Sequence, residues 1–151
     1  MHVVMVCTGN TCRSPMAEAM FRNALAEAKI EGVGVRSAGL CAHPDAPMSG
    51  ASAEELTLRG IPFFRTRARR LTQEMTQDAL VLCMTDWHLK DVRRLFPGAK
   101  ADTLRHFAGL SGDVDDPFGG GERAYRRAAD QIEEAIDQIV ERMKKSFREA
   151  E

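Results

Sequence analysis

Residues 3–15 read VVMVCTGNTCRSP, so a strand, a loop and the start of a helix follow one another in a single run. Val3 to Val6 is wholly apolar and mostly β-branched, which is typical of a strand covered on both faces of its sheet. After the loop, Ser14 and Pro15 are a helix-start signal, because proline fits the first turn, where its missing N–H is not needed. The pattern therefore predicts Cys7 at the carboxyl end of a buried strand and Arg13 beside a helix N-terminus.

The remaining sequence alternates predicted strands with predicted helices. Further strands are expected over residues 32–37, 80–84 and 101–104. Helices are expected after Pro15, over residues 49–59, from 85 or 86 to 95, and along the apolar stripe from Tyr125 to Met143, with a loop at Asp113–Gly121. We predict one domain over residues 1–151 with the α/β fold, an open twisted parallel sheet with helices on both faces. Ligands of such sheets bind beyond the carboxyl ends of the strands, where Cys7 falls.

The amino-acid composition excludes several classes of protein. The chain has 151 residues, of which 44% are hydrophobic and 28% charged, which is ordinary for a globular protein and excludes a disordered one. Lys and Arg number 21 against 22 Asp and Glu, so no strong positive field favours nucleic acid. The apolar runs are far shorter than the ~20 residues that a bilayer requires, and Met1-His2 lacks the basic start of a signal peptide. We therefore expect a cytoplasmic protein that binds neither nucleic acid nor membranes.

The four cysteines do not predict a metal site. No C-x-x-C pair occurs, and the four histidines are scattered along the chain, so zinc ligation is disfavoured. We expect no metal and no cofactor. In a reducing compartment, cysteines near the start of a domain call for a chemical explanation rather than a structural one.

The loop Cys7–Arg13 has the length to curl its N–H groups around one point at a helix N-terminus. Such a nest binds a tetrahedral oxyanion, and Arg13 can hold two of its oxygens. The same field favours the thiolate of Cys7, which would then be a nucleophile directed at phosphorus. The alternative is a structural one, an ordinary strand-end cysteine before a helix cap. Besides Cys7 and Arg13, the expected phosphate-binding residues are Thr8, Gly9, Asn10, Thr11, Cys12 and Ser14.

Residues 7–18, CTGNTCRSPMAE, resemble the phosphate loop of the low-molecular-weight protein-tyrosine phosphatases. Arg36-Ser37-Ala38-Gly39, Ala68-Arg69 and Asp116-Pro117-Phe118 follow in the order of that family, so the resemblance covers nearly the whole chain. It implies a four-stranded parallel sheet, a cysteinyl-phosphate intermediate and no metal.

The resemblance also implies roles for single residues. Cys7 would be the nucleophile, Arg13 the oxyanion clamp and Asp116 the general acid, with Asn10 and Ser14 supporting the loop. On chemistry alone Asp113 and Asp115 rival Asp116, and the position before Pro117 selects Asp116. Leu40 and Phe118 are expected to flank the substrate.

The chain departs from the pattern of the tyrosine-directed members at several positions. Those members usually carry isoleucine at the place of Thr11 and tyrosine at that of Phe118, whereas threonine resembles the bacterial branch that acts on phosphoarginine. A hydroxyl also makes the pocket wall more polar than one suited to an aryl ring. We therefore expect a protein-arginine phosphatase, with protein-tyrosine phosphatase as the alternative. Thr66 stands where many members have a histidine, and Cys41 where the arginine branch has an aromatic residue.

Two further functions use the same loop. In an arsenate reductase, a disulfide would be relayed through two more cysteines; Cys83 falls near one such place, but no cysteine follows it. The other is a non-catalytic, redox-sensing module that binds phosphoanions. We interpret a reversible Cys7–Cys12 disulfide as regulation of an enzyme.

We expect a monomer whose partners are phosphorylated protein substrates. Cys41 and Cys83 are interpreted as packing residues. The basic cluster at Arg65–Arg70 is interpreted as a solvated face rather than a docking site for acidic proteins.

Overall fold

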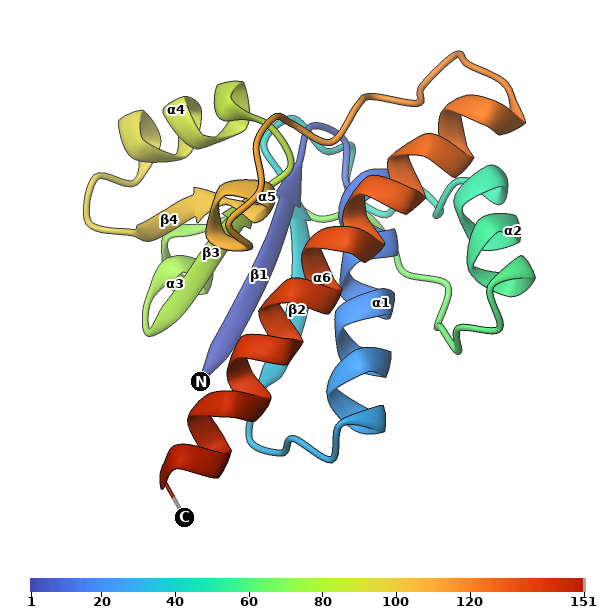
Figure 1. The fold of residues 1–151 in the computed structure, drawn as a ribbon. Coiled ribbons are helices and arrows are strands. Elements are labelled where there is room, and N and C mark those ends of the chain that lie inside the picture. The colour runs from blue at the N-terminus through green and yellow to red at the C-terminus, as the bar shows by residue number, and fades with distance from the viewer. Residues whose placement is uncertain (151) are drawn as a thin grey trace.

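Four strands and six helices make up residues 1–150, the part of the chain that the computed structural model describes (Figure 1). The strands are β1 (His2–Cys7), β2 (Gly34–Gly39), β3 (Ala79–Cys83) and β4 (Lys100–Thr103). The helices are α1 (Arg13–Glu27), α2 (Gly50–Leu58), α3 (Gln73–Thr76), α4 (Asp86–Leu95), α5 (Leu104–Phe107) and α6 (Glu122–Ala150). No helix within these residues combines the length and the apolar character needed to cross a membrane.

All strand pairs are parallel, in the order β2-β1-β3-β4, which confirms the predicted α/β sheet. The chain leaves β1 toward β2 on one side and later returns to β3 on the other side. The strand order therefore reverses beside β1, and a crevice opens there at the carboxyl ends of β1 and β3. Cys7 is the last residue of β1 and lies at this point.

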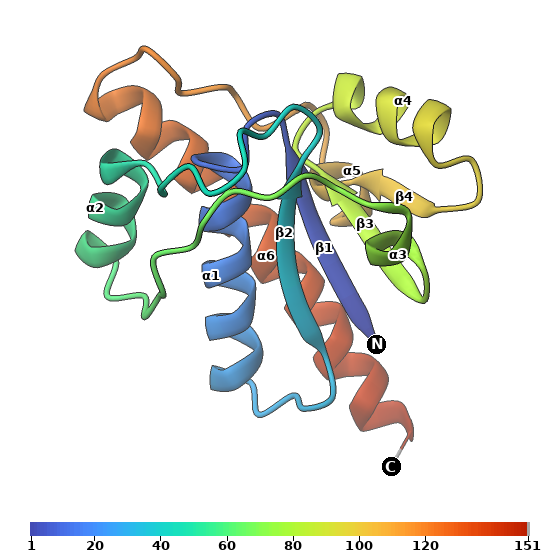
Figure 2. The ribbon, with the colours of Figure 1, turned by 180° about the vertical axis from the view of Figure 1, so that it is seen from behind.

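The alternation of β1 divides the core into two layers. Val3, Met5 and Cys7 face the layer of α1 and α6, whereas Val4 and Val6 face α3 and α4. Figure 1 shows α1 and α6 on one face of the sheet, and Figure 2 shows the same sheet from behind. Both faces of β1 are thus buried, which is why its sequence is a continuous apolar run.

The predicted element boundaries needed small corrections. Helix α1 begins at Arg13 and has Cys12 at its N-cap without a side-chain hydrogen bond, so Ser14 lies inside the first turn and does not cap it. Strand β2 lies two residues later than expected, because its register follows the pairing His2↔Gly34 to Cys7↔Gly39. The short helices α3 and α5 were not predicted, since one turn carries too little periodicity. The loop at Asp113–Gly121 is confirmed, Thr85 rather than Asp86 caps α4, and Ser49 is the N-cap of α2 rather than its first helical residue.

Candidate active site

A cavity of about 290 Å³ opens at the crevice between β1 and β3. It is lined by Cys7, Thr8, Gly9, Thr11, Cys12, Arg13, His43, Ala46, Asp116 and Phe118. The structure therefore brings together the predicted nucleophile, clamp and acid from segments more than a hundred residues apart. Helix α1 starts at this cavity, so its positive dipole end lies at the predicted anion site.

Asn10 holds the loop in its curled shape from behind the cavity. Its φ of 57° lies in the left-handed region that asparagine tolerates better than most residues. Its Nδ2 donates to Ser14 Oγ at 2.9 Å and to Ser37 Oγ at 3.0 Å, and its Oδ1 accepts from the Arg69 N–H at 3.0 Å. One side chain thus joins the loop to α1, β2 and the segment before α3.

Gly39 allows the end of β2 to pack directly against the loop. A Cβ at this position would lie 2.6 Å from the Thr8 carbonyl oxygen, which no side chain can accommodate without a backbone shift. The close approach lets Leu40 N–H donate to Cys7 O at 3.0 Å and Cys41 N–H donate to Thr8 O at 2.9 Å. The Ser37-Ala38-Gly39 segment is therefore a second support for the loop.

The Cys7 sulfur lies 2.9 Å from Ser14 Oγ, and both atoms are buried. Because Asn10 already donates a proton to Ser14 Oγ, the Ser14 hydroxyl proton is available to the sulfur. A hydroxyl donor at this distance stabilises a thiolate more than a thiol. Asn10 and Ser14 do not line the cavity and act through their neighbours.

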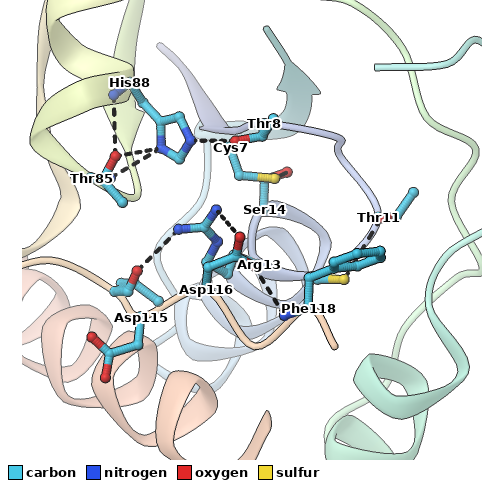
Figure 3. A network of polar contacts seen from close by, with 12 residues as sticks. Cys7, Thr8, Thr11, Arg13, Ser14, Thr85, His88, Asp115, Asp116 and Phe118 are labelled. Carbon is cyan, nitrogen blue, oxygen red and sulfur yellow. Dashed lines mark hydrogen bonds and ion pairs between the residues drawn. The ribbon is translucent and has the colours of Figure 1, made fainter. Parts of the chain in front are cut away.

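Arg13 is fixed between the two loops of the site, and only 5% of its surface is exposed. Its Nη1 donates to Val114 O at 3.1 Å, and its Nη2 lies 3.8 Å from Asp116 Oδ2 (Figure 3). A buried guanidinium held by the backbone keeps its remaining donors at a fixed angle. It is therefore suited to grip an oxyanion at two points.

The three aspartates of the 113–116 segment have different environments. Asp113 accepts from the Asp86 N–H at 2.9 Å and so serves the start of α4. Asp115 is paired with Arg127 at 2.6 Å and accepts a hydrogen bond from Gln131 Nε2. Asp116 alone faces the cavity and Arg13, with 60% of its side chain exposed. The geometry thus favours Asp116 over its two rivals as the proton donor.

Thr8 contacts a histidine that sequence reasoning did not associate with the site. Thr8 Oγ1 lies 2.8 Å from His88 Nε2, and His88 Nδ1 accepts from the Thr85 N–H at 3.2 Å (Figure 3). Burial and, secondarily, the nearby positive charge of Arg13 lower the pKa of His88 from 6.5 to about 4. His88 is therefore a neutral imidazole at pH 7. The helix-cap signal at Thr85 was available in the sequence, but the contact across 80 residues was not.

The contact between Cys12 and Tyr125 was also not predicted from the sequence. Its sulfur lies 3.4 Å from Tyr125 Oη, and Ser49 Oγ donates to the same phenol at 3.3 Å. Burial is the main cause that raises the pKa of Tyr125, which therefore stays protonated. The sequence marked Tyr125 only as a residue on the apolar stripe of α6.

Two expectations about the surroundings of the cavity were wrong. Leu40 does not line it and packs on the core layer of Val4 and Val6, because it follows β2 in the alternation of that strand. His43 and Ala46 line the wall instead. Cys41 is exposed and is not a packing residue.

Cys83 does pack in the core, as expected. Its burial, the largest cause, raises the pKa of its thiol to about 12. A thiol that stays protonated is a poor nucleophile. Cys83 is therefore not suited to relay a disulfide.

The basic segment before α3 has a structural role. Arg67, Arg69 and Arg70 donate to the carbonyl oxygens of Asp45, Ser37 and Ala42, at 3.0 to 3.2 Å. These bonds fasten the loop after β2, which carries the His43–Ala46 wall. Thr66 takes no part in the Asn10 network, and its buried Oγ1 finds no hydrogen-bond partner within residues 1–150.

No group of three or more His, Cys, Asp or Glu side chains within residues 1–150 is arranged to hold a metal ion. The cavity at the N-terminus of α1 instead brings together the Arg13 guanidinium, the thiols of Cys7 and Cys12 and the Asp116 carboxyl group. Such a set matches the charge and the leaving-group chemistry of a phosphate ester or phosphoramidate.

Comparison with known proteins agrees with this geometry. Residues 2–149 match the family described as low molecular weight phosphotyrosine protein phosphatase. The protein-arginine-phosphatase of Bacillus subtilis is 40% identical over 98% of this chain and 100% of its own length. The low molecular weight protein-tyrosine-phosphatase PtpB of Staphylococcus haemolyticus is 33% identical over 87% of this chain and 92% of its own. A solved structure of the YwlE arginine phosphatase, a cysteine-to-serine mutant with a phosphorylated active-site serine, superposes with a TM-score of 0.89 at 38% identity, covering 98% of this chain and 99% of that one.

Proposed function

Because the chain belongs to the low molecular weight phosphotyrosine protein phosphatase family, we propose that it hydrolyses phosphoarginine in proteins through a cysteinyl-phosphate intermediate. The observation that carries the specificity is Thr11, whose side chain lines the cavity beside the loop that would hold the phosphoryl group. The similarity to proteins named arginine phosphatases supports the same assignment.

In the first step, the Cys7 thiolate attacks phosphorus while the P–N bond of phosphoarginine breaks. The loop N–H groups and the Arg13 guanidinium stabilise the charge on the three non-bridging oxygens. The departing guanidine nitrogen takes a proton from Asp116, so arginine leaves as a guanidinium. Asp116 suits this role because it lines the cavity with 60% of its side chain exposed and lies 3.8 Å from Arg13.

In the second step, the Asp116 carboxylate accepts a proton from water, which attacks the phosphorus bound to sulfur. The P–S bond breaks, inorganic phosphate forms and Cys7 returns as a thiolate, stabilised by the Ser14 hydroxyl at 2.9 Å. In the structural relative with serine in place of cysteine, the active-site serine carries the phosphate, which supports covalent transfer.

Thr11 distinguishes the two substrate classes by polarity. A guanidinium is planar and rich in N–H donors, so a hydroxyl in the wall gives it an acceptor. An aryl ring gains nothing from that hydroxyl and favours an apolar wall. The contacts of Thr11 Oγ1 within residues 1–150 are weak, the nearest being Cys12 Sγ at 3.7 Å, so the hydroxyl is available to a ligand.

Phosphotyrosine hydrolysis is the second candidate, and one observation favours it. Phe118 lies at the cavity with 82% of its side chain exposed, an aromatic face against which a phenyl ring can stack. The same face also accommodates a guanidinium by cation–π contact, so Phe118 alone does not decide.

Parallel kinetics on phosphoarginine and phosphotyrosine peptides test the assignment, with wild type and Thr11→Ile in one series. We expect wild type to have the higher kcat/KM for phosphoarginine. Replacing Thr11 by isoleucine removes one hydrogen bond and should shift the ratio of the two kcat/KM values toward phosphotyrosine by roughly 5- to 150-fold. A wild-type preference for phosphotyrosine would contradict the assignment, and equal effects of Thr11→Ile on both substrates would show that Thr11 does not set the specificity.

Reversible oxidation is a second proposal for the same loop. Cys7 and Cys12 both line the cavity, and peroxide would oxidise the Cys7 thiolate to a sulfenic acid that Cys12 then resolves to a disulfide with loss of water. We expect mild peroxide to inactivate the enzyme and dithiothreitol to restore it. Mass spectrometry that finds Cys7 paired with Cys41 or Cys83 would contradict this pairing.

A further inference from the structure

The contacts around His88 fix which of its ring nitrogens carries the proton. A backbone N–H can only donate, so the Thr85 N–H at 3.2 Å requires an unprotonated Nδ1. Thr85 Oγ1 lies 3.0 Å from the same nitrogen. In a neutral imidazole the proton then resides on Nε2, which lies 2.8 Å from Thr8 Oγ1.

His88 is held in this state by its surroundings. The side chain is only 6% exposed and forms a reciprocal capping pair with Thr85 at the start of α4. Arg13 contributes the positive charge that opposes protonation of the ring most strongly, while Asp113, Asp116 and Asp91 favour it weakly. Protonation at Nδ1 would also break the bond from the Thr85 N–H.

The tautomer of His88 fixes the direction of its hydrogen bond with Thr8. If His88 Nε2 donates, Thr8 Oγ1 is the acceptor, and the hydroxyl proton of Thr8 must point elsewhere. Within residues 1–150 no acceptor lies in reach of that proton, and Thr8 lines the cavity beside Cys7. An oxyanion in the cavity is the acceptor that such a donor fits.

We infer that His88 is a positioning residue, which holds the Thr8 side chain so that its hydroxyl donates to an oxygen of the bound phosphoryl group. The inference rests on the phosphatase function proposed above. The Thr8 hydroxyl is then a side-chain donor beside the backbone donors of the loop, and the neutral imidazole of His88 on α4 orients it. Neither residue moves a proton in the reaction.

Binding of inorganic phosphate by isothermal titration calorimetry tests the Thr8 donor without relying on turnover. Thr8→Val keeps the shape of the side chain and removes the donor, so we expect phosphate affinity to fall by about 5- to 30-fold. Thr8→Ser should restore affinity close to wild type. The matched control is Thr57→Val, which removes a hydroxyl from α2 that bonds only to Ala53 O within residues 1–150, and should bind as wild type does. Equal affinity of Thr8→Val and wild type would overturn the inference. Absence of phosphate binding by wild type would instead overturn the proposed function.

Two further experiments test whether His88 positions the Thr8 side chain. His88→Leu should weaken phosphate binding, and the double variant with Thr8→Val should lose little more than either single one, because both remove the same interaction. Additive losses would contradict the coupling. Nitrogen NMR of the ring in wild type should show a protonated Nε2 and a bare Nδ1 at pH 7. The opposite tautomer, or an imidazolium, would overturn the assignment even if His88→Leu failed to fold.

Discussion

The two loops that meet at the cavity are built in opposite ways. The phosphate loop, Cys7–Arg13, is stabilised by three hydrogen bonds of the Asn10 side chain and by the close packing of Gly39 against it. Its Arg13 is only 5% exposed. The proposed acid loop, Asp113–Gly121, has no regular structure, and its candidate site residues Asp116 and Phe118 are 60% and 82% exposed. The first is held in place by buried contacts along its length, whereas the second is anchored through Asp113, Val114 and Asp115 and exposes Asp116 and Phe118 to solvent.

The difference in burial suits the different chemical roles proposed for the two loops. An anion cradle stabilises charge only if its donors are already oriented, so rigidity is part of its function. A general acid must approach leaving groups of different shape and then admit water, so exposure suits it. We therefore expect changes in the cradle to affect all substrates, and changes in the acid loop to depend on the substrate.

The largest expected effect is at the nucleophile. Cys7→Ser should reduce turnover below ~1% of wild type, because serine under the same donors is far less ionised than cysteine. Phosphate should still bind, since the cradle consists of backbone N–H groups and Arg13. Steady-state kinetics and calorimetry on one preparation measure both. Loss of phosphate binding together with activity would break the contrast, because it would show that the cradle depends on the sulfur.

The acid loop offers a matched pair of neighbouring carboxylates. Asp116→Asn should lower kcat by ~10²–10⁴-fold, with the greatest loss for poor leaving groups. Asp115→Asn is the control, because Asp115 is paired with Arg127 at 2.6 Å, away from the cavity. A larger loss in Asp115→Asn than in Asp116→Asn would contradict the assignment of the acid.

A smaller expected effect is the dependence of the free energy of unfolding on pH, caused by His88. Burial and Arg13 lower the pKa of His88 to about 4, whereas an unfolded histidine titrates near 6.5. The unfolded chain therefore binds the extra proton first, so this contribution to stability is present above pH 6.5 and is lost as the pH falls toward 4. The free energy of unfolding of wild type should fall by up to about 3 kcal/mol relative to His88→Leu over that window. Urea titrations at several pH values would measure it, and parallel pH profiles of the two proteins would show that His88 is not buried neutral.

Much of the cradle follows from local sequence. The β-branched run of Val3 to Val6 and the Ser14-Pro15 signal predicted a strand–loop–helix unit, and the pairings of β1 confirmed it. The apolar repeat through Ile132, Ile136 and Ile139 predicted α6 for the same reason, because those residues form one buried stripe.

What the sequence did not predict depends on contacts between distant segments. The Thr8–His88 and Cys12–Tyr125 contacts span 80 and 113 residues, so no local pattern signals them. Leu40 was placed beside the substrate from the resemblance, but the direction of a side chain just after a strand depends on strand register. The arginines before α3 are exposed, as expected of a solvated face, but nothing in their spacing reveals the carbonyl groups that three of them bind.

We propose that the cradle presents a phosphoryl group to Cys7 for covalent transfer. The direct measurement is mass spectrometry of peptides from enzyme denatured during turnover of a phosphoarginine peptide, with Cys7→Ser treated in parallel. We expect one phosphoryl group on the peptide that contains Cys7 in the wild type, and none on peptides carrying Cys41 or Cys83. Sustained release of phosphate with no phosphoryl group on Cys7, or with activity undiminished in Cys7→Ser, would contradict the covalent mechanism.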